Sequence, residues 1–397
     1  MKKHLIALAI TSAFAASSAM ADVEIGPFAM YGTLQTAVEN VSVTAGPTAV
    51  LTSLTSNQNR LMDQTSKLGF KVKHELSPDL AAIAQIESRV MLGNTGTTTD
   101  DKSEIGNRNT FAGISSKSFG TVRLGRYDNA YKLSGKQQAL DLYNNLNDAS
   151  NDYGSKSILN RLGGRQGDIV AYESPNWGGV TVLASYNFGK DQTNSISGGS
   201  TANTASNKIS NVLAQQTSLA VGYANGPFTV GYGYTTVSNV AWKLDGASAA
   251  TAIYTAGGAH SLSATQFGGA FTMGPVSVGG VYETTASSLA GVATAYDRKQ
   301  DVFGLTLDYR DGPLEVQLRA AQAYDVTGTG LVALTANTGA TQTGVVVQYA
   351  LNKFTKVIGS YTSLQNAASA NYIAGSEFSL SAGSSQSTAA LGLAVSF

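Results

Sequence analysis

The sequence has no cysteine among its 397 residues and only 7 prolines. The lack of cysteine excludes a disulfide framework and cysteine-based zinc sites. It also suits a chain that crosses an oxidising compartment, where free thiols would pair wrongly. Beyond the first 21 residues there is no run of about 20 apolar residues, which excludes a membrane-spanning helix in that part of the sequence.

An excess of charge of one sign is also lacking, because 26 basic residues balance 26 acidic ones. No basic block is present that could release counterions from a phosphate backbone, so nucleic acid is not expected as a partner. Runs with helical periodicity are rare after the first residues, whereas the chain holds 43 glycines and 18 tyrosines. This balance argues against a soluble α/β enzyme.

Residues 1–21 have the pattern of a secretory signal peptide. Lys2 and Lys3 give the basic start, the stretch from Leu5 to Ala16 is the apolar core, and small residues precede a cleavage site after Ala21. The core is too short for a membrane anchor. We therefore expect a mature domain of residues 22–397, with 24 basic and 26 acidic side chains and a net charge of −2.

The mature sequence divides into strands of mostly about 9–14 residues, the length that a tilted membrane strand needs. We expect sixteen, at 23–40, 60–76, 79–92, 105–117, 120–129, 166–174, 178–188, 213–224, 227–240, 259–273, 275–285, 299–310, 313–326, 342–351, 353–365 and 385–397. Short connections, which hold five of the prolines, alternate with long polar ones. This pattern predicts an all-β, sixteen-stranded antiparallel transmembrane β-barrel, closed because an open sheet edge has no hydrogen-bond partner in lipid.

Alternation within the strands agrees with a barrel wall. Between Thr388 and Phe397 the odd positions are apolar and the even positions are small or polar, and the stretch from Thr65 to Lys73 alternates apolar residues with lysine and glycine. In a β-sandwich the same apolar face would point at a second sheet, so alternation alone leaves both architectures open. Aromatic residues near strand ends indicate interfacial girdles: Tyr31, Phe119, Trp177, Phe188, Phe228, Tyr309, Tyr349, Phe354 and Phe397.

One long connection, at about 128–162, differs from the others. It is polar, and it carries Asp141, Asp148 and Asp152. A structureless insert of this length is uncommon in a compact domain. Ser134 and Gln137 fit a helix capping box, and apolar residues follow at 140, 143 and 146. We interpret it as a third external loop that folds into the barrel and narrows the bore.

Several short motifs, in order, carry a family likeness. They are Phe28–Thr33, Ser66–Lys71, Asn107–Ile114 with Phe119–Arg126, Arg161–Arg165 leading to Val170–Pro175, and the terminal Phe397. With them the whole chain resembles the trimeric general porins of Gram-negative outer membranes, most closely the beta-proteobacterial branch. The loop lacks the Pro-Glu-Phe sequence of the enterobacterial members.

The resemblance implies a constriction with basic residues on the barrel wall and acidic residues on the third loop. The basic positions match Lys67, Arg108, Arg126 and Arg161, and the loop acids would be Asp141, Asp148 and Asp152. Lys71, Glu87 and Arg165 would also face the pore. Phe397, with Val395 and Leu393, resembles the recognition signal for the barrel-insertion machinery.

The expected function is passive diffusion of ions and small hydrophilic solutes through a water-filled outer-membrane channel, with a mild anion preference because the basic residues outnumber the acidic ones. The resemblance implies a homotrimer among outer-membrane lipids and lipopolysaccharide, without a cofactor or metal ion. Two alternatives stay open: a substrate-specific channel or adhesin, and an outer-membrane hydrolase. The hydrolase is disfavoured because the mature chain keeps only His74 and His260, neither in a recognisable catalytic motif.

Overall fold

The computed structural model describes residues 23–46, 58–63, 66–92, 105–137, 158–189, 215–240, 260–289, 296–329, 336–373 and 380–397. The first half of the chain forms β1 (Val23–Ile25), β2 (Phe28–Thr44), β3 (Gln58–Asp63), β4 (Lys67–Glu75), β5 (Leu80–Arg89), β6 (Thr110–Ser116), β7 (Gly120–Asp128), helix α2 (Ala130–Gln137), β8 (Arg165–Glu173) and β9 (Val180–Asn187). The second half forms β10 (Gln216–Asn225), β11 (Phe228–Val240), β12 (His260–Met273), β13 (Val276–Leu289), β14 (Tyr296–Asp311), β15 (Leu314–Ala323), β16 (Thr327–Thr329), β17 (Ala340–Ala350), β18 (Thr355–Asn366) and β19 (Ser385–Ser396).

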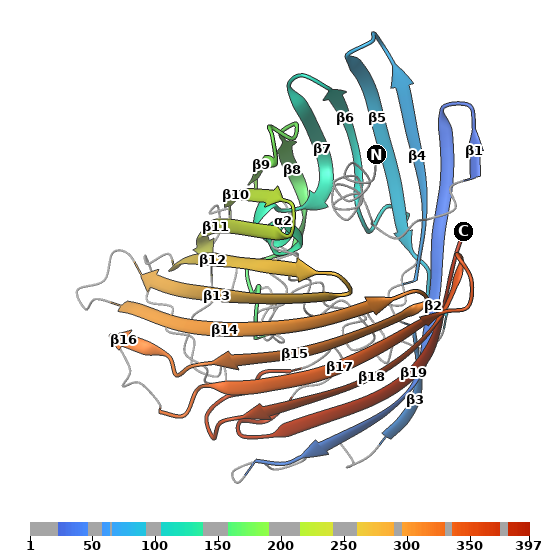
Figure 1. Cartoon of the computed structure of the whole chain (residues 1–397). Coiled ribbons are helices and arrows are strands. Elements are labelled where there is room, and N and C mark those ends of the chain that lie inside the picture. The colour runs from blue at the N-terminus through green and yellow to red at the C-terminus, as the bar shows by residue number, and fades with distance from the viewer. Residues whose placement is uncertain are drawn as a thin grey trace.

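These strands form one antiparallel sheet that closes on itself (Figure 1). Each long strand pairs with its sequence neighbour, and β19 returns to pair with β2 over the register from Ser385↔Thr44 to Ser396↔Thr33. When β3 with β4 and β15 with β16 are each counted as one strand, and the three-residue β1 is left out, the described residues form the expected closed barrel of 16 strands. Closure leaves no free sheet edge, as a membrane-spanning sheet requires.

The first predicted strand, 23–40, was placed too early. Residues 23–25 form a short hairpin with the start of β2, in which Ile25 is opposite Phe28, and the long strand runs from Phe28 to Thr44. Gly26 has a φ of 62°, the left-handed conformation that a tight turn at this point needs. The last residue of the chain pairs with the start of β2, because the Gly32 N–H donates to the Phe397 carbonyl at 2.8 Å and the Phe397 N–H donates to the Gly32 carbonyl at 3.0 Å.

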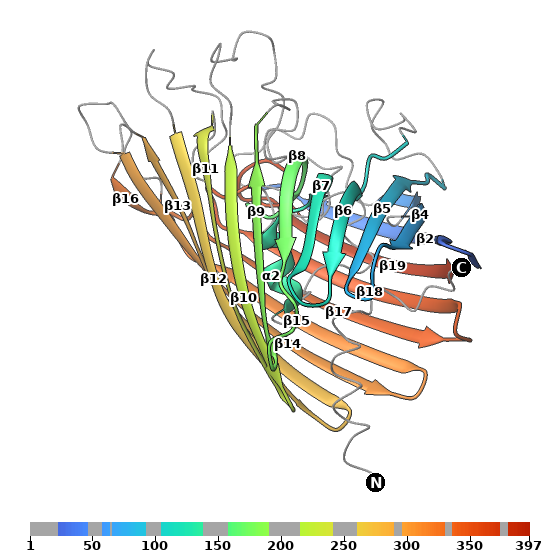
Figure 2. The ribbon, with the colours of Figure 1, turned by 90° about the horizontal axis from the view of Figure 1, so that it is seen from above.

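Connections sort by length onto the two ends of the barrel. Short turns at 76–79, 117–119, 174–179, 226–227, 274–275, 312–313 and 351–354 join strand pairs at one end, and the strand ends that the longer connections join lie at the other end (Figure 2). Two of the short turns are tied together: the Asp79 carboxylate accepts hydrogen bonds from the Ser116 hydroxyl at 2.7 Å and the Ser118 hydroxyl at 2.9 Å. These bonds lower the pKa of Asp79 below its ordinary value.

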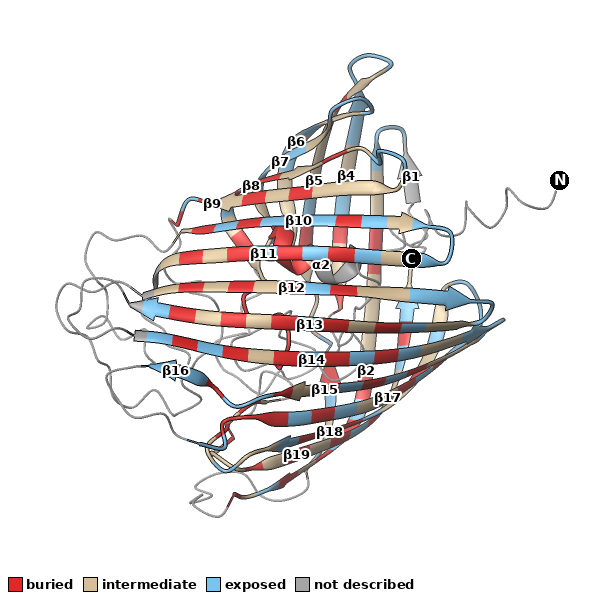
Figure 3. Ribbon diagram, turned by 60° about the vertical axis from the view of Figure 1, so that its left-hand side comes forward, coloured by how far each residue is buried: buried red, intermediate tan, exposed pale blue. Residues whose placement is uncertain are grey.

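The distribution of polar and apolar side chains is the reverse of that in a soluble protein, with apolar residues outside and polar residues inside. On β10, Ser218 and Ala220 are buried, whereas Leu219 and Val221 are exposed, and Figure 3 shows the same alternation along the neighbouring strands. The exposed outer positions carry large apolar residues on most strands, among them Phe70, Ile114, Leu124, Val230, Phe267, Leu305, Leu318 and Leu391. The buried inner positions carry polar ones, among them Gln216, Thr235, Gln266, Thr285, Gln300, Gln342 and Gln386. An apolar outside and a polar inside fit a wall between lipid and water.

Most of the expected girdle residues lie on the outer surface. Phe119, Trp177 and Phe228 are 78%, 53% and 57% exposed. Tyr31 was assigned wrongly, because it is only 2% exposed and its hydroxyl donates to Glu87 inside the barrel. Proximity to a strand end does not tell which face of the sheet a tyrosine occupies.

In the described part of the chain no helix is long and apolar enough to cross a membrane.

Helix α2 follows β7 and lies inside the ring of strands, beside β9, β10 and β11 (Figures 1 and 2). Asn129 caps its first turn, since the Asn129 side-chain oxygen accepts the Lys132 N–H at 2.7 Å. The predicted capping role of Ser134 was wrong: Ser134 lies within the helix, and its hydroxyl donates to the Tyr131 carbonyl at 2.6 Å. The apolar positions 140, 143 and 146 and the acids Asp141, Asp148 and Asp152 lie outside the described residues.

Candidate functional site: a charged wall and an anchored loop

The inner face of β4 to β6 gathers basic side chains around one carboxylate. Glu87 on β5 is 5% exposed, and it lies 2.8 Å from the Arg108 Nε and 3.9 Å from the Lys67 Nζ. The Tyr31 hydroxyl donates at 2.9 Å to Glu87 Oε2, the oxygen nearer to Lys67, and the Lys71 Nζ lies 4.1 Å from the centre of the Tyr31 ring. Alternation along β4 explains the placement, because Lys67, Gly69 and Lys71 face inward while Phe70 faces lipid.

Gly69 makes room for this cluster. The Tyr31 ring lies directly over Gly69, and a Cβ atom there would overlap the ring. Because β2 and β4 are paired with Tyr31 opposite Gly69, the ring crosses to the neighbouring strand and reaches Glu87 on the next one. Because Gly69 has no side chain, the Tyr31 ring can lie over it and its hydroxyl can reach the Glu87 carboxylate.

A second cluster lies where the loop leaves β7 and returns to β8. Asp128 accepts a hydrogen bond from the Lys132 Nζ at 2.9 Å and lies 3.4 Å from the Arg165 Nε. Asn109 donates to Asp128 at 3.1 Å and accepts from Arg165 at 2.8 Å. The Arg126 Nε donates to the Asn107 carbonyl at 3.0 Å, which holds this guanidinium against the start of β6.

The two clusters have an excess of positive charge. They contain six basic side chains, Lys67, Lys71, Arg108, Arg126, Lys132 and Arg165, against the two carboxylates Glu87 and Asp128. The side chains of Lys67, Arg108 and Arg165 are 23%, 14% and 12% exposed, so they are partly in contact with the lumen. Ion pairing within the wall fixes the geometry of the bases without neutralising the group.

The connection 129–164 is anchored on the opposite side of the barrel. The Tyr131 hydroxyl donates to the Glu283 carboxylate of β13 at 2.8 Å, and the Asn160 N–H donates to the same oxygen at 2.8 Å. One carboxylate therefore holds both the leaving and the returning limb of the connection. Burial, with the nearby Glu283 charge, raises the pKa of Tyr131 well above its ordinary value, so the phenol stays protonated and donates.

Further contacts extend this anchor along the wall. The Gln266 amide donates to the Tyr131 carbonyl at 2.9 Å, and the Gln216 amide donates to the Leu162 carbonyl at 2.8 Å. Tyr131 and Leu162 are fully buried against Val237 and Leu262. The loop thus combines a polar anchor with an apolar footprint on β11 and β12.

The structure places Arg161 on this returning limb rather than on the wall of β4 to β8. Its side chain is buried, its Nη1 donates to the Gln300 side chain of β14 at 2.6 Å, and its guanidinium lies 5.4 Å from the centre of the Tyr372 ring. Sequence position alone gave no sign of this, because Gln300 and Tyr372 follow more than 130 residues later.

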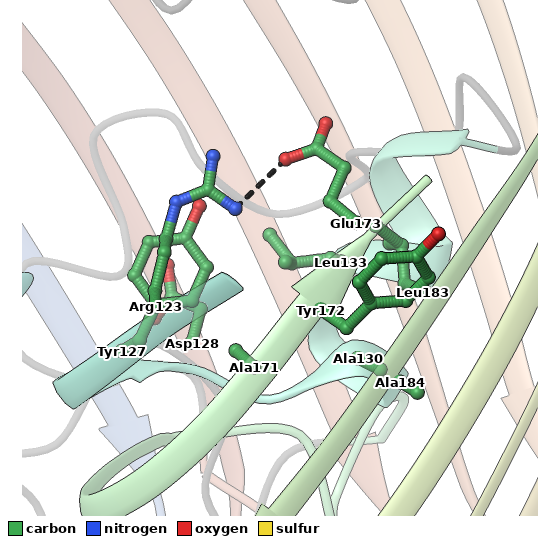
Figure 4. Close-up of a pocket in the computed structure, with 10 residues that line it drawn as sticks. All are labelled: Arg123, Tyr127, Asp128, Ala130, Leu133, Ala171, Tyr172, Glu173, Leu183 and Ala184. Carbon is green, nitrogen blue, oxygen red and sulfur yellow. Dashed lines mark ion pairs between the residues drawn. The ribbon is translucent and has the colours of Figure 1, made fainter. Parts of the chain in front are cut away.

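A hollow lies between α2 and the wall, lined by Ala130 and Leu133 of the helix and by residues of β7, β8 and β9 (Figure 4). At its edge Arg123 forms an ion pair with Glu173 at 2.9 Å, and its guanidinium lies 4.9 Å from the centre of the Tyr127 ring. Arg123 was absent from the predicted basic residues. Its inward position two residues before Gly125 could have been read from the alternation of β7.

Sequence reasoning missed two more inner pairs. The Arg60 Nη2 lies 2.8 Å from the Glu39 carboxylate, and the Arg89 Nε lies 3.6 Å from Asp63. His74 lies on β4 beside the short turn at 76–79, whereas His260 begins β12 at the other end of the barrel. The two histidines therefore do not share a site. Within the described residues no group of three or more His, Asp or Glu side chains could hold a metal ion.

Comparison with known proteins identifies the family. A profile described as Gram-negative porin matches residues 5–391. The chain belongs to the Gram-negative porin family. Relatives of this porin include the major outer membrane protein P.IB of Neisseria meningitidis, 31% identical over 188 residues that cover 47% of this chain and 49% of the relative. The P.IB protein of Neisseria sicca is 33% identical over 186 residues, 47% of each chain. The porin thus spans about half the length of the curated relatives it matches.

Solved structures agree on the fold. The anion-selective porin from Comamonas acidovorans matches with a TM-score of 0.67 at 21% identity, covering 93% of this chain and 99% of that one. OmpF of Salmonella typhi, solved with daunomycin, matches with a TM-score of 0.60 at 17% identity, covering 95% and 100%. The family and its outer-membrane relatives make this porin an outer-membrane β-barrel protein.

Proposed function

We propose that this porin is a general diffusion channel, a passive water-filled path for ions and small hydrophilic solutes. The observation that carries the proposal is the closed barrel with a polar inner face, which bears a group of basic side chains and to which both limbs of the 129–164 connection are attached at Glu283. Such a channel selects solutes by the width of its bore and by the electric field of the charged side chains that line it, and it needs no chemical step. We therefore propose no enzymatic activity and no cofactor for it.

The basic wall is the proposed selectivity element. Lys67, Arg108 and Arg126, supported by Lys71 and Arg165, outnumber the carboxylates beside them, which favours anions mildly. Asp141, Asp148 and Asp152 are proposed to carry the opposing charge on the connection. The neighbour from Comamonas acidovorans is described as anion-selective, but at 21% identity it supports only the fold, so the preference rests on these side chains.

The assembly and targeting are also proposals. We propose a homotrimer in contact with outer-membrane lipids and lipopolysaccharide, exported by a signal peptide cleaved after Ala21. Phe397, Val395 and Leu393 would be read by the barrel-insertion machinery. A solved OmpT of Vibrio cholerae is described as a trimer form. Slower mobility of the unboiled than of the boiled protein on a denaturing gel is the expected result, and equal mobility would contradict a stable trimer.

Single-channel recording tests the channel directly. Purified protein in planar bilayers should give ohmic current steps in KCl, which small neutral sugars reduce and large neutral polymers leave unchanged because only the small ones enter the bore. A protein that inserts with native heat-modifiable mobility yet carries no current would refute the proposal. A flux that is high for one solute only, and that saturates at a low concentration of this solute, would favour a substrate-specific channel.

A further inference from the structure

One part of the inner wall carries a cluster of apolar side chains among the polar ones. On β2, β13, β14, β15, β17 and β18, several inward positions carry valine, leucine or alanine: Val41, Val43, Val281, Val302, Ala321, Ala323, Ala340 and Leu364. Apolar surface of this kind is costly against a water-filled lumen. Two chain segments cover it. Ile158 and Leu159 come from the returning limb of the 129–164 connection, and Ala370, Tyr372 and Leu380 come from the connection between β18 and β19.

The two segments meet at a single glutamine. The Gln300 side-chain oxygen accepts the Arg161 Nη1 at 2.6 Å and the Tyr372 hydroxyl at 2.6 Å. The Arg161 guanidinium also lies over the Tyr372 ring at 5.4 Å, within the range of a cation–π contact. Gln300 in turn donates to the Tyr324 carbonyl at 2.8 Å, so the amide cannot turn away from its two donors without losing that bond.

The segment that carries Tyr372 is itself fixed to the barrel. Asn366, the last residue of β18, donates to the carbonyls of Tyr372 and Ser384 at 2.9 Å each and accepts the Tyr372 N–H at 2.9 Å. Gly383 donates to the Ala370 carbonyl at 2.9 Å. A Cβ at Gly46, just after β2, would overlap the backbone of Ala382 and Gly383. The segment therefore packs closely on the end of the sheet, and Tyr372 has a firm base.

We propose that residues 367–373, which follow β18, brace residues 158–164 of the returning limb, and that Tyr372 is the positioning residue, acting through Arg161. Arg161 then acts mainly by holding that limb, in contrast to the solute-facing role proposed for Arg108. The inference rests on the proposed channel function for its effect on current, but the contact itself can be tested without current.

The test uses the absence of cysteine from the sequence. Leu159→Cys, at a buried position in the returning limb, introduces the only thiol of the mature protein. Its rate of labelling by a water-soluble maleimide is measured in the folded protein, alone and combined with Tyr372→Ala, Tyr372→Phe or Tyr361→Ala. Tyr361 is the matched control, because it lies on neighbouring β18 but is 47% exposed on the outer face.

We expect labelling to accelerate about tenfold or more with Tyr372→Ala, because the ring and its hydrogen bond are both lost. Tyr372→Phe keeps the ring over Arg161 and loses only the bond to Gln300, so about fivefold is expected. Tyr361→Ala should leave the rate unchanged. Equal rates in the Tyr372 variants and the control would overturn the brace. If Tyr372→Ala does not fold, Tyr372→Phe, which retains the volume, decides alone.

Current recording then separates the brace from the channel. With a working channel, Tyr372→Ala and Arg161→Gln should each raise open-channel noise, and the double variant should be no noisier than the single ones because both break one contact. Additive effects would contradict a shared brace. An unmodified protein without current would refute the channel proposal, while the labelling result would still decide the contact.

Discussion

Replacement of Glu283 by alanine should loosen the whole inward connection, because this carboxylate accepts from both of its limbs. The Tyr131 hydroxyl and the Asn160 N–H each donate to it at 2.8 Å. Buried hydrogen bonds to a charged group contribute about 1.5–3 kcal/mol each, so the attachment of the connection should weaken by about 3–6 kcal/mol. Glu283→Gln keeps a neutral acceptor at the same place, and should cost about half as much.

The barrel should remain closed in these variants, because the strand pairing around β13 is unaffected. Contacts from Gln216 and Gln266 still hold the connection, so we expect larger fluctuations and not complete release. The assay is the open-channel current noise in planar bilayers, with thiol labelling at Leu159→Cys as a second measure. Noise should rise in the order wild type, Glu283→Gln, Glu283→Ala.

Glu315→Ala is the matched control. It removes a carboxylate from β15 that pairs with Arg310 at 2.8 Å beside a short turn, far from the inward connection. The control should resemble the wild type in noise and in labelling. If Glu283→Ala folds and also resembles the wild type in both measurements, the reasoning that one carboxylate holds both limbs is refuted.

Three further outcomes are expected. Gly69→Ala should displace the Tyr31 ring from Glu87 and lower the anion preference, which is measured by reversal potential. An unchanged preference would contradict the view that Tyr31 and Glu87 order the basic side chains. Burial raises the pKa of Tyr131, so the hydrogen bond from its phenol to Glu283 is fully stabilising below about pH 10 and is lost as the pH rises through the pKa of Tyr131 in the folded protein. Current noise should therefore increase at alkaline pH, and Tyr131→Phe should show no such increase. The Phe397 ring packs on Gly32, so Gly32→Leu should slow the formation of the heat-modifiable form on refolding, whereas normal assembly would show that the ring is dispensable.

Most strands were predictable because their side chains alternate between the two faces of the sheet over most of their length. The bounds of β7, β12 and β19 follow from alternation and from the prolines and glycines in the short turns. The errors occur where a local pattern has two structural meanings. A serine followed three residues later by glutamine fits a capping box, yet the same pair occurs inside α2 because Asn129 already caps it.

The site could be predicted only in part, for a related reason. Alternation on β4 predicts that Lys67 and Lys71 share a face of the sheet, but it does not predict that Lys67 lies beside Glu87 and Lys71 beside the Tyr31 ring. Arg161 lies in a connection, where no periodicity fixes direction, and its partners on β14 and in the 367–373 segment are set by how two loops fold back. Contacts over more than a hundred residues leave no local trace in one sequence.

The central claim is that the basic wall sets the ion preference, and reversal potential in asymmetric KCl tests it most directly. The interaction energy between a unit charge and an ion about 6 Å away in water is roughly 0.7 kcal/mol, and screening at physiological salt about halves this energy. Because anion and cation respond with opposite sign, Arg108→Ser should lower the anion-to-cation permeability ratio about threefold. Lys67→Ser should act in the same direction, and Lys353→Ser, in a short turn, should have little effect. A cation preference in the wild type, or a ratio unchanged by both wall variants, would contradict the account.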